Sequence, residues 1–173
     1  VHARQLFVFS RWSGLTGDKT FERMANNIFA YLTTNFWDVD HEGWYSRVTV
    51  DGKPLDLTKD LYAHAFVLFG LVHYAECIGK RDAEPWIRKT IKVLQEHFLR
   101  SDGSYKEKMN RCFLDKTDNQ RSQNPHMHLL EAALALSKCY EGNQYSSLVK
   151  SLLTLFCETF LDKKQLIIRE YLN

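Results

Sequence analysis

The sequence repeats at a fixed interval, and this repeat constrains the fold more than any other feature. Phe36, Phe98 and Phe160 are equally spaced along the chain. Each phenylalanine ends a helical stretch with apolar residues four and seven positions earlier, and a polar, turn-prone tract follows it. Because such periods are typical of stacked supersecondary units, we expect a helical repeat array whose units bury their apolar faces against one another.

Each repeat is predicted to contain two helices of different character. The first helices are expected at roughly residues 2–14, 59–80 and 125–141. The second helices are expected at roughly residues 19–36, 84–98 and 145–160. Two of the first helices are apolar nearly all round, whereas the second helices are amphipathic, so the sequence predicts an inner ring of buried helices covered by an outer ring.

The links between helices differ in length, and this difference locates the predicted functional end. Links within a repeat are short and polar, while links between repeats run for about 15 to 25 residues. Two long links carry strand-like sequence, from Trp44 to Pro54 and from Tyr105 to Lys116, and residues 166–171 also favour a strand. Long ordered loops are often functional, so we expect the site where the inner helices begin.

Composition and charge exclude several classes of protein. The 173 residues suffice for a sizeable core, and the net charge of +2 without a basic run gives no support for a nucleic-acid partner. No apolar run is long enough for a membrane span, and no signal peptide is evident. We therefore expect a cytoplasmic protein with no membrane partner. Free, buried thiols in a reducing compartment are expected at the four scattered cysteines, Cys77, Cys112, Cys139 and Cys157.

Two segments closely resemble the N-acylglucosamine 2-epimerase family, especially its bacterial sugar isomerases and epimerases. They are Lys59–Leu68 (KDLYAHAFVL) and Arg121–Ala132 (RSQNPHMHLLEA), and the opening Ala3–Phe9 and the turn at Gly43–Tyr45 agree with them. The resemblance implies an all-α (α/α)6 toroid with short β-hairpin loops at the active-site end. This chain would be its N-terminal half, a single domain of three helical hairpins at about residues 1–58, 59–123 and 124–173.

The resemblance also implies an activity. Members of the family isomerise or epimerise simple sugars at C1 and C2 without a cofactor, so a small sugar is the expected substrate and no metal is expected. The family takes further histidines from the second half of its toroid, beyond this chain, so we expect these 173 residues alone to be inactive. The expected protein partner is the remaining half of the toroid or a second copy in a homodimer.

The candidate site residues come from three inner helices. At 100° per residue, Asn124, His128 and Glu131 fall within about 60° on one helical face. The resemblance implies that Asn124 binds a sugar hydroxyl and that His128 is an active-site histidine, a residue type suited to moving protons near neutral pH. Glu131 would hold His128 or face the substrate. His126 lies about 200° from His128, so zinc binding by the pair is disfavoured.

Arg4, Tyr62 and Trp44 complete the candidate set. The resemblance implies that Arg4 contacts the substrate carbonyl or ring oxygen, and a fixed cation there would stabilise an enediolate. Tyr62 occupies the position of Asn124 in the preceding repeat and resembles the family's substrate-binding tyrosine. Trp44 would stack on a sugar face, with packing inside the loop as an equal alternative.

Less specific interpretations remain open for the set as a whole. A buried histidine satisfied by a carbonyl, a surface arginine and a core tyrosine are the structural alternatives for His128, Arg4 and Tyr62. Two other functions are considered. A glycoside hydrolase would need two carboxylates, of which Glu131 alone is well placed. A non-catalytic sugar-binding or interaction domain is the other.

Overall fold

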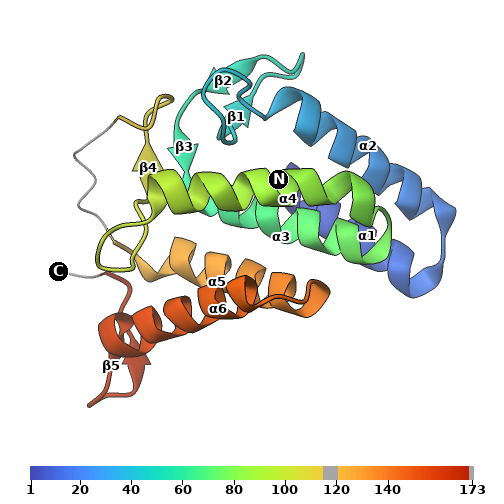
Figure 1. Ribbon diagram of the computed structural model, residues 1–173. Coiled ribbons are helices and arrows are strands. Elements are labelled where there is room, and N and C mark those ends of the chain that lie inside the picture. The colour runs from blue at the N-terminus through green and yellow to red at the C-terminus, as the bar shows by residue number, and fades with distance from the viewer. Residues whose placement is uncertain (115–120, 172–173) are drawn as a thin grey trace.

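The computed structural model describes residues 1–114 and 121–171. Its helices form antiparallel hairpins that lie side by side (Figure 1). The inner helices are α1 (His2–Thr16), α3 (Leu61–Cys77) and α5 (Gln123–Cys139). The outer helices are α2 (Lys19–Asn35), α4 (Lys80–Val93) and α6 (Asn143–Leu155). All six helices predicted from the sequence are confirmed, with ends that differ by a few residues.

The repeat is confirmed at the ends of the outer helices. Single π-helical turns, η1 (Leu94–Phe98) and η2 (Phe156–Phe160), continue α4 and α6. Phe98 and Phe160 close these turns and are fully buried. In the first repeat, α2 ends one residue before Phe36, which is partly buried against the core. The phenylalanines therefore mark where each outer helix turns back toward the inner ring.

Short antiparallel strand pairs form the end of the molecule where the inner helices begin. They are β1 (Arg47–Val48) with β2 (Pro54–Asp56), β3 (Lys59–Asp60) with β4 (Lys108–Met109), and β5 (Leu161–Asp162) with β6 (Ile167–Ile168). The predicted strand-like tracts contain β1, β4 and β6, and β2 begins at the end of the first tract; the second tract, up to Lys116, ends outside the described residues. β3 was predicted as the start of a helix and β5 as a turn, so these two strands were missed. The β3–β4 pair joins the links of two successive repeats.

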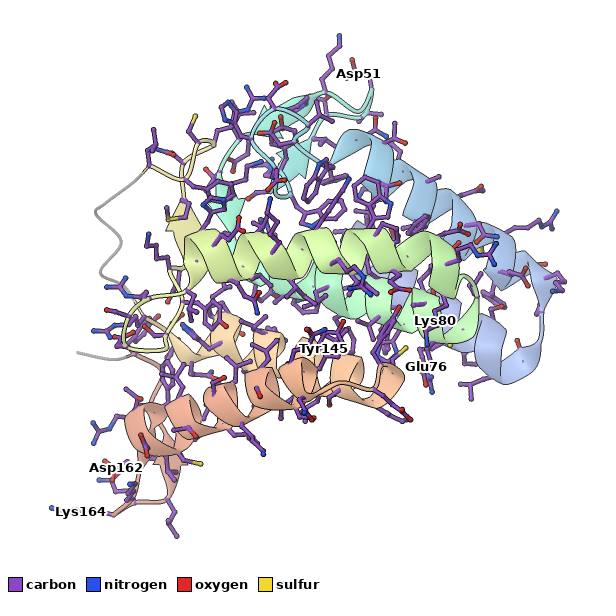
Figure 2. All side chains as sticks on the ribbon, in the orientation of Figure 1. Asp51, Glu76, Lys80, Tyr145, Asp162 and Lys164 are labelled. Carbon is purple, nitrogen blue, oxygen red and sulfur yellow. The ribbon has the colours of Figure 1, made fainter. Side chains whose placement is uncertain are left out.

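The two ends of the hairpins therefore differ in character. Figure 2 shows Glu76 and Lys80 at the end with the short links, and Asp162 and Lys164 at the end with the strand pairs. Gly17, between α1 and α2, adopts the left-handed conformation with a φ of 71°, which lets the chain reverse within a few residues.

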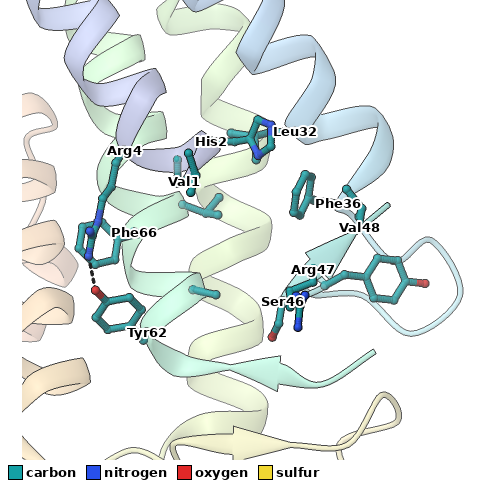
Figure 3. A pocket seen from close by; sticks show the side chains of 14 residues that line it. Val1, His2, Arg4, Leu32, Phe36, Ser46, Arg47, Val48, Tyr62 and Phe66 are labelled. Carbon is teal, nitrogen blue, oxygen red and sulfur yellow. Dashed lines mark hydrogen bonds between the residues drawn. The ribbon is translucent and has the colours of Figure 1, made fainter. Parts of the chain in front are cut away.

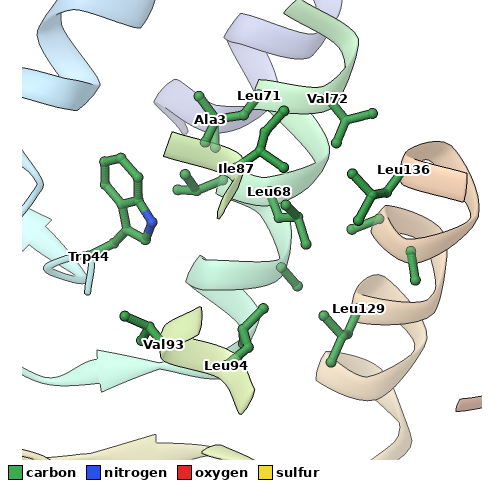
Figure 4. Packing of buried hydrophobic residues seen from close by; sticks show 14 of the residues in the cluster. Ala3, Trp44, Leu68, Leu71, Val72, Ile87, Val93, Leu94, Leu129 and Leu136 are labelled. Carbon is green, nitrogen blue, oxygen red and sulfur yellow. The ribbon is translucent and has the colours of Figure 1, made fainter. Parts of the chain in front are cut away.

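The core lies between the inner helices and extends to the outer ones. Figure 4 shows Leu68 and Leu71 of α3 packed between Ala3 of α1 and Leu129 and Leu136 of α5. Ten of the 17 residues of α3 are buried, as its uniformly apolar sequence predicted. At Gly70 the helices approach so closely that a Cβ would lie 2.7 Å from the carbonyl oxygen of Ala3. This contact sets the spacing of α1 and α3.

The flanking helices leave apolar side chains exposed, as expected for an arc of hairpins. On α1, Val8, Trp12 and Leu15 are half or more exposed, and Leu134 of α5 is 47% exposed. The expectation of buried cysteines was wrong for Cys112 and Cys157, which are exposed, and Cys77 and Cys139 are only partly buried; all four thiols are free, as expected. Within residues 1–114 and 121–171, no helix is long and apolar enough to cross a membrane.

Candidate active site

Four side chains from three inner helices meet at the end of the molecule that carries the strand pairs. The guanidinium carbon of Arg4 lies 4.2 Å from the ring centre of Phe66, and Arg4 donates a hydrogen bond to the hydroxyl of Tyr62. The His128 ring lies 4.5 Å from Phe66 and 5.1 Å from Tyr62, centre to centre. Figure 3 shows Arg4 stacked on Phe66 and bonded to Tyr62. Arg4, Tyr62 and His128 thus lie together where the inner helices begin, as expected from the sequence, whereas Asn124 is not part of this contact.

The repeat explains why these groups meet. Arg4, Phe66 and His128 follow one another at the interval of the repeat, so they occupy the same position on α1, α3 and α5. Equivalent positions on adjacent parallel helices lie side by side, and the three side chains therefore form a row across the inner face. The same interval was recognised in the sequence for Tyr62 and Asn124 but missed for this row, although the signal was present.

Glu131 orients His128. The Nδ1 atom of His128 lies 2.7 Å from Oε2 of Glu131, one turn further along α5. Because a carboxylate can only accept a hydrogen bond, the proton sits on Nδ1 and Nε2 is left available for proton transfer. The side chain of His128 is 17% exposed and that of Glu131 is 52% exposed, so the pair is open to the inner face. Of the two roles expected for Glu131, the geometry supports holding His128.

Two cavities flank Tyr62. One of about 450 Å³ lies between the start of α1, β1 and the start of α3, and it includes Arg4, Tyr62 and Phe66 in its wall. The other, of about 310 Å³, lies between the starts of α3 and α5, where Asn124 and Tyr62 share its wall. Asn124 is exposed. Tyr62 and Asn124 thus both face open space next to the Arg4–His128 row.

Trp44 does not belong to this site, and its expected role in stacking on a sugar is wrong. Its side chain is fully buried. The indole Nε1–H donates to Thr90 Oγ1 at 2.9 Å, and the ring packs edge-on against Trp37. Packing inside the loop was the alternative that the sequence left open, and that alternative is confirmed. Trp44 anchors the first long link to α4.

His64 and His126 have structural roles. His64 Nε2 accepts from the backbone N–H of Trp44 at 3.0 Å, and its Nδ1 lies 2.8 Å from the carbonyl oxygen of Asp60. His126 repeats this arrangement with Tyr105 and Ser122, at 3.0 and 2.7 Å. Burial lowers the pKa of His64 to about 3 and also lowers that of His126. Each neutral imidazole therefore fastens a long link to the first turn of an inner helix.

A buried ion-pair network, which was not predicted from the sequence, holds the first long link against the start of α3. Lys59 and Asp38 are fully buried and lie 3.0 Å apart. Arg111 donates to both oxygens of Asp38, at 2.8 and 2.9 Å, and to the hydroxyl of Tyr45. Burial opposes ionisation of Asp38, but hydrogen bonds from Arg111 and Lys59 outweigh it and hold its pKa well below the ordinary value. Sequence spacing gave no signal that these four residues meet.

One group of side chains away from this site has the residue types of a metal site. Ligand atoms of Glu42, Glu96 and His97 lie within 4.8 Å of one another. The ammonium of Lys92 lies 3.1 Å from both carboxylate oxygens of Glu42 and 3.8 Å from Glu96. Because Lys92 already supplies the positive charge for both carboxylates, we assign no metal to this group.

The fold and this site together define the N-terminal half of an α/α toroid with a polar site at the beginnings of its inner helices. The chain belongs to the N-acylglucosamine 2-epimerase (GlcNAc 2-epimerase) family, whose profile matches residues 1–173. The family expected from the two sequence segments is therefore confirmed.

Known relatives and solved structures agree with this assignment. The chain is 28% identical over 171 residues to the cellobiose 2-epimerase of Dictyoglomus turgidum, covering 94% of this chain and 44% of that protein. It is 29% identical over 179 residues to the mannose-6-phosphate isomerase of Rhizobium meliloti, covering 100% and 44%. The structure of cellobiose 2-epimerase from Bacillus thermoamylovorans superposes with a TM-score of 0.93 at 25% identity, covering 99% of this chain and 47% of that one.

The share of the relatives' length that this chain covers agrees with half of a toroid. The chain spans less than half the length of these relatives, which is the share expected for three of six hairpins. A family 76 glycoside hydrolase (mannosidase) from Bacteroides thetaiotaomicron superposes with a TM-score of 0.77 at 13% identity, so it shares the fold alone.

Proposed function

We propose that the protein carrying this sequence is a cofactor-independent sugar isomerase or 2-epimerase, of the N-acylglucosamine 2-epimerase or mannose isomerase type. The relatives are named as sugar epimerases and isomerases, which supports this class. The observation that carries the proposal is the meeting of Arg4, Tyr62 and His128 around one open face. A guanidinium, a phenol and an imidazole in one place are the groups that a polyol undergoing proton transfer requires.

In the proposed mechanism, proton transfer runs through an enediolate of the open-chain sugar. Nε2 of His128, left available by the Nδ1 contact with Glu131, exchanges a proton with C1 or C2. When a base removes the proton from C2, the electron pair moves toward C1 and negative charge collects on the C1 oxygen. Arg4 would stabilise that oxygen, and return of a proton to C2 from the opposite side gives the epimer. If the proton of the C2 hydroxyl moves to the C1 oxygen, return of a proton to C1 gives the ketose instead.

Tyr62 and Asn124 would position the substrate. Both occupy the same place in successive repeats, and both line the cavity between α3 and α5. A phenol and an amide each donate and accept hydrogen bonds, as binding of sugar hydroxyls requires. We place no catalytic step on either residue; they would fix C1 and C2 relative to His128.

The length of the chain bears on activity. Because the family's additional acid/base histidines lie in the second half of the toroid, we propose that the 173 residues are inactive alone and that the full-length protein turns over sugar. The remaining half, or a second copy, would cover the exposed apolar side chains on α1 and α5. This partner remains a proposal, as does a cytoplasmic location.

The hydrolase alternative has weaker support at the residue level. A glycosidase needs two carboxylates on either side of the scissile bond. Glu131 is engaged with His128, Asp60 accepts from the backbone N–H of Ala63, and Glu107 accepts from that of Ser122. The carboxylates of Glu131, Asp60 and Glu107 thus already bind other groups of the protein. A non-catalytic sugar-binding domain would bind sugar through Tyr62 and Asn124 but would not require a histidine oriented for proton transfer.

A product assay separates these functions. The full-length protein would be incubated with mannose, fructose, N-acetylmannosamine and cellobiose, and the products followed by NMR. We expect a C2 epimer or the corresponding ketose or aldose from at least one sugar. Cleavage of cellobiose to glucose would favour the hydrolase, and binding of a sugar without any product would favour the non-catalytic domain.

A further inference from the structure

The larger of these two cavities carries a cationic side chain, Arg47, that the proposed mechanism does not use. Its wall includes two arginines, Arg4 and Arg47, and no aspartate or glutamate among the described residues that line it. Figure 3 shows Arg47 and Ser46 across the cavity from Arg4, Phe66 and Tyr62. Arg4 belongs to the row that would act on C1 and C2, whereas Arg47 lies across the same cavity from it.

The Arg47 guanidinium has no carboxylate bound to it among the described residues. Asp56 lies opposite Arg47 across the β1–β2 pair, and its pKa is lowered first by the hydrogen bond from Thr58 and to a smaller extent by the Arg47 charge, although the described residues show no ion pair between the two. The Asp56 carboxylate instead accepts from the backbone N–H of Thr58 at 3.0 Å. The cation at the cavity wall is therefore only partly compensated.

The two residues just before the strand that carries Arg47 are hydrogen-bonded to other segments. The Ser46 hydroxyl donates to the carbonyl oxygen of Thr58 at 2.7 Å. The backbone N–H of Tyr45 donates to the carbonyl oxygen of Phe36 at 2.8 Å, and Arg111 donates to its hydroxyl at 3.1 Å. The backbone next to β1 is thus tied to the end of α2 and to Thr58, so the backbone of Arg47 is held at the cavity wall while its side chain is exposed.

The cavity on the other side of Tyr62 provides a contrast. Its wall carries Asp60 and Glu107 beside a single lysine, Lys108, among the described residues. An anionic ligand would meet carboxylates there, whereas it would meet two guanidinium groups in the larger cavity. The two cavities thus differ in the sign of the charge that they favour, although both open next to the same tyrosine.

We propose that the substrate is an anionic sugar, and that Arg47 binds the phosphate or carboxylate at the carbon farthest from C1. A guanidinium presents paired donors that match the oxygens of either anion, and such charge-assisted bonds are the strong ones. About 450 Å³ is enough space for a monosaccharide with such a group. The inference rests on the proposed function, because it assigns Arg4 and His128 to the reacting end of the same substrate.

The test compares three sugars with two variants of the full-length protein. Mannose 6-phosphate, mannuronate and mannose would each be offered to wild type, to Arg47→Gln and to Arg23→Gln. Arg23 is an exposed arginine of α2 outside both cavities, so its variant controls for the loss of one positive charge. For each protein, kcat/KM would be measured with each sugar, and the value for each anionic sugar would be divided by the value for mannose.

For wild type we expect a ratio well above one for mannose 6-phosphate or for mannuronate, and the sugar that gives it identifies the anion. Arg47→Gln should lower this ratio by about tenfold to a hundredfold, mainly through KM, as loss of one charge-assisted hydrogen bond does. Arg23→Gln should leave the ratio as in wild type. A preference for mannose, or a change of less than about threefold in Arg47→Gln, would overturn the inference while leaving the isomerase proposal standing. Absence of turnover with these three sugars and with all four sugars of the product assay would overturn both.

Discussion

The buried His64 makes the stability of the fold depend on pH, and the size of the effect follows from its environment. In the folded chain the ring is fully buried and burial lowers its pKa from the ordinary value of 6.5 to about 3. Nε2 must stay unprotonated because it accepts the backbone N–H of Trp44. In the unfolded chain the imidazole titrates near its ordinary pKa.

The sign of the effect follows from proton linkage. Below pH 6.5 the unfolded state binds a proton at His64 that the folded state does not bind, so acid favours unfolding. The contribution of His64 is present in full above pH 6.5 and is lost at about 1.4 kcal/mol per pH unit as the pH falls toward 3. Between pH 7.5 and pH 5.0 the predicted loss from this one group is about 2 kcal/mol.

The assay is equilibrium urea unfolding of wild type and His64→Gln at pH 7.5 and pH 5.0. Glutamine keeps an acceptor but does not titrate, so the variant should lose about 2 kcal/mol less than wild type between the two pH values, whatever its absolute stability. His41→Gln, a change at an exposed histidine, should behave as wild type. Equal losses in wild type and His64→Gln would refute the reasoning, since the acid sensitivity would then lie in other groups.

Three further predictions test the elements that position the site. Asp38→Asn leaves the buried Lys59 without its carboxylate and should lower the free energy of unfolding in urea by about 3–5 kcal/mol. The control, Asp51→Asn at an exposed position, should leave the urea midpoint unchanged, and similar midpoints for both variants would contradict the role of the network. Gly70→Ala places a Cβ against the Ala3 carbonyl and should lower the free energy of unfolding by about 1–3 kcal/mol, although alanine has the better helix propensity. The loss should exceed that of Gly14→Ala, whose Cβ would meet only the Cys77 side chain, and a Gly70→Ala variant more stable than wild type would show that α1 shifts freely. Trp44→Phe leaves Thr90 without its indole donor and should lower the free energy of unfolding by about 1–3 kcal/mol, with the substrate KM unchanged. A raised KM would indicate that Trp44 contacts the substrate after all.

Helix positions, the inner and outer rings and the predicted functional end could all be obtained from the sequence, because period and hydrophobic pattern decide them. The repeat brings Tyr62 and Asn124 into register, and the same interval counted from Arg4 would have given the row through Phe66 to His128. The site was therefore predictable in outline from the spacing of its members.

Contacts between the long links could not be predicted from repeat spacing or hydrophobic pattern. The network of Asp38, Lys59 and Arg111 joins residues up to 73 positions apart in segments without helical period, so no spacing rule brings them together. Trp44 was misassigned for a related reason. An aromatic residue in a turn looks the same in sequence whether it faces a ligand or the core, and its burial depends on α4 and on Thr90.

Proton transfer by His128 is tested most directly by solvent isotope incorporation, with the full-length protein in deuterium oxide. If His128 exchanges its proton with the sugar at C1 or C2, the product should carry deuterium there by NMR, and His128→Ala should lose most turnover together with the label. Turnover by His128→Ala at the wild-type rate, or wild-type product without deuterium, would contradict proton transfer by this histidine.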